Sequence, residues 1–184
     1  MESISELLIR ACRENGAFAA ARIERDGVVY DPSFRDICRS NSCGLYGRCY
    51  ACPPDVGPVE ELIRKAKAYP HGVLYQTVGQ LEDSFDYEGM QEAKKQHLVT
   101  VRTVDAAARK ILRREFLHLG TGGCNLCEKC AKLTEEPCRF PDRVIRSISG
   151  YGINVSATSK NAGLKYVNGP DTVTYFALLL FQEE

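Results

Sequence analysis

Residues 122–138 read GGCNLCEKCAKLTEEPC, and the spacing of their cysteines decides how the whole chain is interpreted. Cys124, Cys127 and Cys130 are separated by two residues each, and Cys138 follows after seven more. Three thiolates at this spacing can bind three corners of a cubane while the loop turns its N–H groups toward the sulfur atoms. Zinc is more often held by two well-separated pairs of cysteines. The spacing therefore favours an iron–sulfur cluster over zinc.

A second group of cysteines lies earlier, in the segment CRSNSCGLYGRCYACPP at residues 38–54. Its intervals suit zinc as well as a cluster, so zinc stays open as the alternative. Cys52 precedes a proline, and in two-cluster bacterial ferredoxins a cysteine before proline ligates the opposite cluster. Local ligation and an exchange of Cys52 and Cys138 between the groups therefore both stay open. The eight predicted ligands are Cys38, Cys43, Cys49, Cys52, Cys124, Cys127, Cys130 and Cys138.

Length and compartment explain why these cysteines are assigned to metal and not to disulfides. The chain has 184 residues, which is enough to bury a core without cross-links. The first residues, MESISELLIR, lack the features of a secretory signal, and no apolar run reaches the roughly 18 residues of a membrane span. We therefore expect a cytoplasmic protein, where grouped cysteines mark metal or redox sites. The ninth cysteine, Cys12, continues the apolar face of a helix and is expected to be buried.

Charge and motifs argue against several other functions. Lys+Arg and Asp+Glu both number 24, so no basic field would attract nucleic acid or an anionic membrane. The sequence contains no dinucleotide or phosphate-loop fingerprint. His71, His97 and His118 are distant in sequence from both cysteine groups, and His97 has the helical spacing of a core residue. Catalytic residues therefore stay unassigned.

Hydrophobic periodicity and turn signals predict a mixture of helices and strands. Helices are expected at residues 2–15, after Pro58, at 87–119 and after Pro141. Strands are expected in a hairpin at 17–30 and at 72–78, 153–155 and 172–181, with a polar loop at 156–163. This mixture predicts an α+β fold in which helices cover one face of a small mixed sheet. We expect a single domain, residues 1–184, with two cysteine-rich cluster-binding loops at 38–54 and 122–141.

Four blocks of sequence carry a resemblance to a known family. They are CGLYGRCYACPP at 43–54, GGCNLCEKC at 122–130, CRFPDR at 138–143 and GYGINV at 150–155. Together they resemble an uncharacterised family of predicted metal-binding proteins, the domain of unknown function 2284. The resemblance implies metal binding at these cysteines and implies no particular reaction. The family is common in anaerobic archaea and bacteria, which would suit an oxygen-sensitive cluster protein.

Three functions follow from these observations. The first is electron transfer by two 4Fe–4S clusters to an unidentified redox partner, because eight cysteines match eight iron corners and leave no iron open. The second is a redox enzyme with an open iron or a substrate pocket beside a cluster, to which the loop at 156–163 would contribute. The third is a structural zinc-binding interaction module. The chain is expected to be a monomer or a homodimer.

Overall fold

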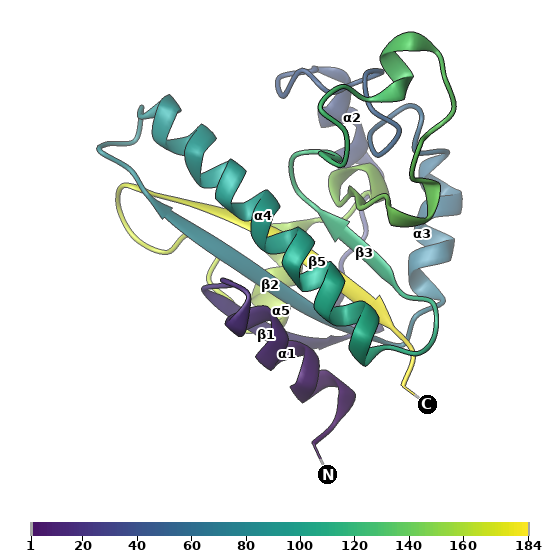
Figure 1. Cartoon of the computed structure of the whole chain (residues 1–184). Coiled ribbons are helices and arrows are strands. Elements are labelled where there is room, and N and C mark those ends of the chain that lie inside the picture. Colours follow the sequence, from purple (N-terminus) through teal and green to yellow (C-terminus); the bar gives the residue numbers. More distant parts are fainter. Residues whose placement is uncertain (1, 184) are drawn as a thin grey trace.

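Two long strands lie at the centre of the computed structural model, which describes residues 2–183 (Figure 1). β2 (His71–Gln80) and β5 (Thr172–Phe181) pair antiparallel along their whole length. The described sheet has five strands in the order β1-β2-β5-β3-β4, and its outer strands are β1 (Ala19–Glu24), β3 (Leu117–Gly120) and β4 (Arg146–Ser147). Since β3 and β4 are parallel and the other pairs antiparallel, the sheet is mixed. The predicted α+β class and the predicted strand at 172–181 are confirmed.

Helices pack on both faces of this sheet, and not on one face as the sequence predicted. α1 (Ile4–Glu14) and α4 (Tyr87–Ile111) cover one face. α3 (Val59–Lys67) and α5 (Val155–Asn161) lie on the other face. A further short helix, α2 (Ser33–Arg39), stands at one end of the sheet (Figure 1).

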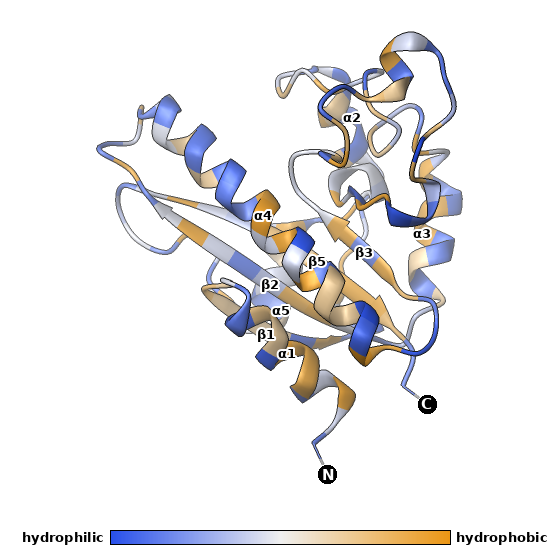
Figure 2. Ribbon diagram, viewed as in Figure 1, coloured by the Kyte–Doolittle hydropathy of each residue, from blue (hydrophilic) through white to orange (hydrophobic). Residues whose placement is uncertain are grey.

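The alternation of side chains along the central strands explains the two covered faces. In β5, Ala177 and Leu179 point toward α1 and α4, whereas Leu178 and Leu180 point toward α3. All four are at most 1% exposed. A strand buried on both faces reads as a continuous apolar run, which is why TVTYFALLLF predicted a central strand. Figure 2 shows the resulting hydrophobic residues along parts of β2, β3 and β5.

The first helix forms as the sequence predicted. Ser3 accepts a hydrogen bond from the backbone N–H of Glu6, and the Glu6 side chain accepts one from the backbone N–H of Ser3, which completes a capping box. Cys12 lies on the inner face of this helix and is fully buried, so its predicted role as a small hydrophobic residue is confirmed. Burial raises the pKa of the Cys12 thiol to about 12.

The hairpin predicted at residues 17–30 is wrong. Ala19–Glu24 forms a single strand that pairs with β2, and Arg25–Gly27 forms a 3₁₀ turn, η1. Asp26-Gly27 therefore lies in a helical turn and not between two paired strands. After it, Tyr30 makes only an isolated bridge to Ile153 within the described residues. A distant partner, β2, competes for the hydrogen bonds that the predicted hairpin would have used.

The long helix predicted to residue 119 ends earlier, at Ile111. Leu112 has extended backbone angles, and Leu117–Gly120 forms β3, which pairs antiparallel with β5. The error arose because Leu117 and Leu119 continue the apolar spacing of the helix. All four residues of β3 are buried, so they suit a strand covered on both faces equally well.

The elements predicted near the second cysteine group also need correction. Instead of a helix, Pro141–Arg143 forms a 3₁₀ turn, η3, followed by the short strand β4. The predicted strand at 153–155 is replaced by a helix N-cap, because the Asn154 side chain accepts a hydrogen bond from the N–H of Ala157 at 3.0 Å. The predicted loop at 156–163 is therefore mostly helix α5.

The three histidines lie in β2, α4 and β3, outside both cysteine groups. His97 is fully buried, which confirms its predicted core position, and its Nδ1 lies 2.8 Å from the Thr77 hydroxyl. His118 bridges the Tyr75 hydroxyl at 2.8 Å and the Asp105 carboxylate at 3.1 Å. This buried chain connects β2, β3 and α4 and satisfies polar groups that would be costly to bury unpaired.

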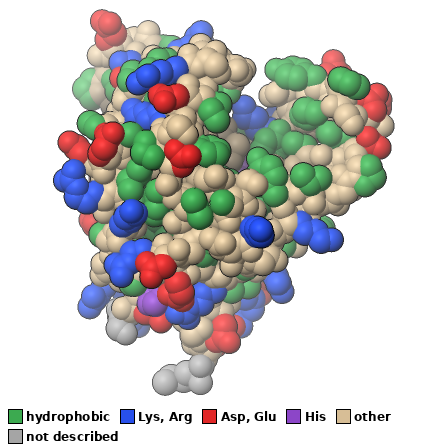
Figure 3. Space-filling model, turned by 180° about the vertical axis from the view of Figure 1, so that it is seen from behind, with side chains coloured by type: hydrophobic (Ala, Val, Ile, Leu, Met, Phe, Trp, Pro, Cys, Tyr) green, Lys and Arg blue, Asp and Glu red, His purple; other side chains and the backbone are tan. Residues whose placement is uncertain are grey.

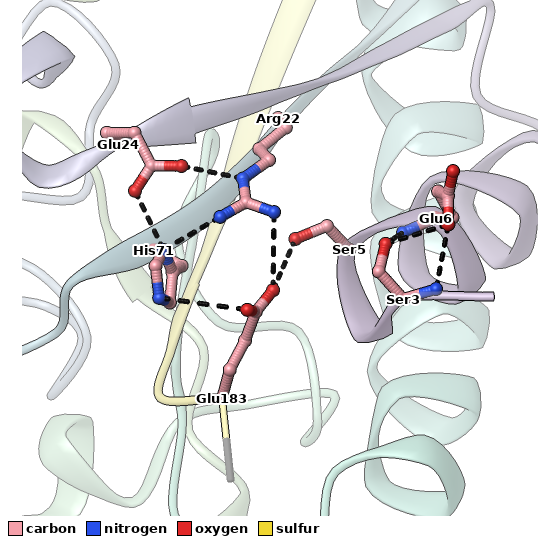
Figure 4. Close-up of polar contacts among 7 residues, drawn as sticks. All are labelled: Ser3, Ser5, Glu6, Arg22, Glu24, His71 and Glu183. Carbon is pink, nitrogen blue, oxygen red and sulfur yellow. Dashed lines mark hydrogen bonds and ion pairs between the residues drawn. The ribbon is translucent and has the colours of Figure 1, made fainter. Parts of the chain in front are cut away.

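A polar network joins the chain's two ends to the sheet (Figure 4). Arg22 of β1 and His71 of β2 both contact the Glu24 carboxylate, at 2.6 and 2.7 Å. Glu183 reaches Arg22 and accepts a hydrogen bond from the Ser5 hydroxyl at 3.0 Å. The pKa of Glu24 is lowered, chiefly by its hydrogen bond with Arg22. The network fastens α1 and the segment after β5 to the edge of the sheet.

Candidate metal centre

The cysteine segments 38–54 and 122–141 lie together at one end of the sheet, beside α2 (Figure 1). We call them the first and second cysteine segments. Neither contains a strand, and their regular structure is limited to the end of α2 and short 3₁₀ turns. Cys38 lies in α2 near its end, and not in an irregular loop as predicted. The other seven predicted ligands lie in turns and irregular backbone, as predicted.

Polar contacts hold the two segments together. One contact joins the two segments themselves, from the Tyr50 hydroxyl to the Glu136 carbonyl at 2.7 Å. Two more join a segment to a residue just beyond the other: Lys132 Nζ lies 2.6 Å from the Asp55 carboxylate, and the Ser147 N–H donates to the Ala51 carbonyl at 2.9 Å. Lys132 also stands over the Tyr50 ring, 5.8 Å from its centre. The segments therefore approach each other through named contacts, although they are far apart in the sequence.

Two glycines let the backbone of the second segment approach the first. Gly122 and Gly123 have φ angles of +90° and +77°, a conformation that other residues adopt only with strain. A Cβ atom on Gly123 would lie 2.8 Å from Leu45 Cδ1 and 3.5 Å from Cys52 Sγ. The Gly-Gly pair before Cys124 thus supplies both the turn and the room for close contact with Cys52.

Five thiols line a small hollow between the segments, which we call the thiol pocket. Its volume is about 20 Å³, and its cysteines are Cys49, Cys124, Cys127, Cys130 and Cys138. Apolar side chains of Leu126, Phe140 and Val144 complete the wall. Cys49 comes from the first segment, so the thiols here are not those of one segment alone. Cys49 is the cysteine of the first segment that lines this hollow, and the exchange of Cys52 and Cys138 considered from the sequence stays a prediction.

The remaining three predicted ligands line a larger space, which we call the open cavity. Cys38, Cys43 and Cys52 form part of its wall, and its volume is about 330 Å³. The opposite wall comes from the first turns of α4, with Tyr87, Gln91 and Lys94, and from Tyr175 of β5. Figure 3 shows the molecule hollowed between the part that carries the cysteines and the protruding end of α4, β2 and β5.

Neighbouring thiols and charges shift the pKa values of the site. The hydrogen bond with the Cys52 thiol lowers the pKa of Cys49 to about 6, against the opposing effect of burial. The same contact raises the pKa of Cys52. A hydrogen bond with Cys127 raises the pKa of Arg139, which can therefore stabilise a thiolate there. Burial raises the pKa of Cys124.

The donor set fits a thiophilic metal group. Thiolates favour zinc, copper(I) and iron–sulfur clusters, whereas magnesium and calcium prefer oxygen ligands. Within residues 2–183 no three His, Cys, Asp or Glu side chains converge as they would on one bound metal ion. The thiol pocket has about the volume that one water molecule needs, so a cubane would require the segments to move apart.

Sequence reasoning missed the wall that faces the first group of cysteines. Lys94 and Tyr87 belong to α4 and Tyr175 to β5, and none was singled out as a site residue. No local motif marks them, because their place at the cavity follows from how α4 lies across the sheet. The polar loop at 156–163, considered as a pocket wall, contributes no residue to the open cavity.

A mixed α/β fold with eight cysteines gathered at one end defines a cysteine-rich protein with a candidate metal centre. The chain belongs to the family described as "Predicted metal-binding protein (DUF2284)", whose model matches residues 21–181. The resemblance noted in the sequence is thereby confirmed. No curated protein and no solved structure matches the chain. Within residues 2–183, no helix combines the length and apolar character needed to cross a membrane.

Proposed function

We propose that this protein binds two 4Fe–4S clusters and transfers single electrons to or from an unidentified redox partner. One cluster takes Cys124, Cys127 and Cys130 together with Cys138 or Cys49 at the thiol pocket. The other takes Cys38, Cys43 and Cys52 at the open cavity, so one of its irons would have no cysteine ligand, in contrast to the full ligation expected from the sequence. The observation that carries the proposal is the division of eight of the nine cysteines between two adjoining hollows.

The contact between Cys49 and Cys52 supports a role in electron transfer. These two residues belong to one small buried cluster, yet each lines a different hollow. Clusters at the two sites would therefore be immediate neighbours. Arg139 beside Cys127 would offset part of the negative charge of a thiolate-ligated cluster.

The test is the metal and sulfide content of protein purified without oxygen, with a visible spectrum before and after dithionite. Two cubanes predict about eight irons and about eight acid-labile sulfides per chain, with absorption that bleaches on reduction. Stoichiometric zinc in colourless protein would contradict the proposal and leave the structural zinc module that the sequence also allowed.

Single alanine substitutions test the assignment at the thiol pocket. Five thiols line it and a cubane has four corners, so either Cys49 or Cys138 can be lost while the other serves. Cys49→Ala and Cys138→Ala should each keep the full iron content, because four thiols remain at the pocket, whereas replacing Cys124, Cys127 and Cys130 together leaves two thiols and should lose about four irons. Equal iron loss in all three proteins would refute this redundancy.

A second candidate function is a redox enzyme with substrate bound beside a cluster. The observation that favours it is the open cavity, which has three cysteines on its wall and about 330 Å³ of space. Three thiolates would leave one iron of a cubane without a cysteine ligand. An iron of this kind can bind a ligand directly, which a fully thiolate-ligated cluster cannot.

A further inference from the structure

The open cavity has the size of a small-molecule site. Its volume of about 330 Å³ lies at the lower end of the range of about 300–1,000 Å³ for small-molecule pockets. Its lining combines apolar surface with hydroxyl and amide groups, including those of Tyr46, Tyr87 and Gln91. A small polar molecule suits this size and lining.

The charge of the cavity wall selects the kind of ligand. Apart from the cysteines, Lys94 is the only ionisable Lys, Arg, His, Asp or Glu among the described residues that line the cavity. Lys94 is half-buried, and a Cβ atom on Gly122 would lie only 2.8 Å from its Cε. Within residues 2–183 the lysines with ion pairs are Lys95 and Lys132, and not Lys94. Lys94 thus lines the cavity and has no ion pair among the described residues that would compete with an anion.

The neighbouring helix end does not add a phosphate site. α4 begins at Tyr87, but the Asp86 carboxylate accepts hydrogen bonds from the N–H groups of Gly89 and Glu82, at 2.8 and 3.1 Å. An acidic side chain therefore already occupies this end of the helix. A phosphate group is usually held by several donors or an arginine fork, whereas a carboxylate can be held by one lysine and a hydroxyl.

We propose that the open cavity binds a small carboxylate-bearing ligand, with Lys94 pairing with its carboxylate beside Cys38, Cys43 and Cys52. The inference rests on the proposed function, because a cluster beside the cavity would report the ligand in the spectrum, while the hydroxyl groups of Tyr46 and Tyr87 can supply the second point of attachment. Lys94 lies on α4 and the thiols on the first cysteine segment, so the ligand bridges the two walls of the cavity.

The test is a titration of the anaerobically purified, dithionite-reduced protein with malonate, followed by the electron paramagnetic resonance spectrum. Malonamide, which has the same shape without the charges, serves as the control ligand. Malonate should change the signal of one cluster with saturation, and malonamide should not. Lys94→Gln should weaken malonate binding by at least about tenfold, the loss expected for a charge-assisted hydrogen bond.

Lys95→Gln is the matched control variant. Lys95 is the next residue of the same helix, but its side chain is exposed and pairs with Glu92 at 3.2 Å. This variant should bind malonate like the unchanged protein, and both variants should keep the full iron and sulfide content. Equal effects of the two substitutions would overturn the assignment to Lys94.

The outcomes separate this inference from the proposed function. If the protein contains about eight irons but its spectrum does not change with malonate, the ligand site is overturned and the electron-transfer proposal stands. A protein without iron would overturn both. If Lys94→Gln shifts the spectrum before any malonate is added but binds malonate normally, Lys94 only balances the charge of the cluster, and the ligand site is likewise overturned.

Discussion

The sheet and the cysteine segments are held in shape by different means. In the sheet, β2 and β5 share a continuous ladder of paired residues, and side chains such as Leu178 and Tyr75 are fully buried. The cysteine segments have few buried residues, namely Cys49, Ala51, Cys52, Pro53 and Ala131, and Cys43 is exposed. Burial of apolar surface accounts for the sheet. The segments depend on a few polar contacts and, in our proposal, on a bound metal group.

Metal removal should produce the largest difference between the two regions. Structural metal groups supply much of the folding free energy of the loops that bind them. Metal-free protein should therefore exchange its amide hydrogens orders of magnitude faster in residues 38–54 and 122–141, while β2 and β5 keep their protection. Hydrogen exchange followed by mass spectrometry measures both regions in one sample. Unchanged exchange in the cysteine segments would show that they fold without metal.

The reverse experiment weakens the sheet and leaves the metal centre intact. Leu178 is fully buried and lies opposite Leu74 and Leu119 in the neighbouring strands. Leu178→Ala should lower the free energy of unfolding by about 2–5 kcal/mol, because it leaves a cavity between packed layers. Chemical denaturation measures the loss, and the metal content of the folded fraction should stay the same.

A matched substitution in the other region completes this comparison. Leu133 lies in η2 (Ala131–Thr134) beside the second cysteine group, and its side chain is 48% exposed. Leu133→Ala should change the free energy of unfolding by less than about 0.5 kcal/mol. If it destabilises the protein as much as Leu178→Ala does, the cysteine region has an apolar core of its own.

These contrasts also explain how much the sequence could predict. The strand at 172–181 was predictable because burial on both faces leaves a continuous apolar run. The core position of His97 was predictable because it shares the helical spacing of core residues. The helix predicted to residue 119 failed because Leu117 and Leu119 fit the spacing of a helix and of a buried strand alike. Such ambiguity is resolved only by a distant partner, here β5.

The grouping of the cysteines was predictable, and the arrangement of the groups was not. Spacing marked eight cysteines as candidate ligands, because grouped cysteines are typical of metal and disulfide sites, and their ligation stays a prediction. Cys49 and Cys52 are separated by two residues, yet they line different hollows, which depends on how the segments fold against each other. Lys94 carries no local signal, because its place follows from the packing of α4.

Acid should weaken the sheet region through His97. Burial, and then the nearby charge of His118, lower the pKa of His97 from 6.5 to about 4 in the folded protein. Between pH 6.5 and 4 the unfolded chain therefore binds a proton that the folded protein does not, so stability falls as pH falls through this range. At about 1.4 kcal/mol per pH unit, the loss approaches roughly 3 kcal/mol.

Denaturation curves at several pH values measure this effect. His97→Gln keeps a polar group beside Thr77 but cannot take up a proton, so its stability should depend less on pH in this range. Thr77→Val removes the hydrogen bond to His97 and keeps the histidine, so it should lower stability while retaining the pH dependence. If the free energy of unfolding of His97→Gln falls with pH as steeply as that of the unchanged protein, other groups cause the acid effect. Buried His118 is the first candidate.

The smallest effect is expected from the ion pair between the second cysteine segment and Asp55, which follows the first segment. Lys132 Nζ lies 2.6 Å from the Asp55 carboxylate, but its side chain is 31% exposed, and water weakens such pairs. Lys132→Met should speed amide exchange in the two segments several-fold and leave β2 and β5 unchanged. Lys129→Met, at an exposed position of the same segment, is the control and should change neither region. If Lys132→Met also exposes the sheet, the two regions unfold together, and the contrast between burial and local contacts does not hold.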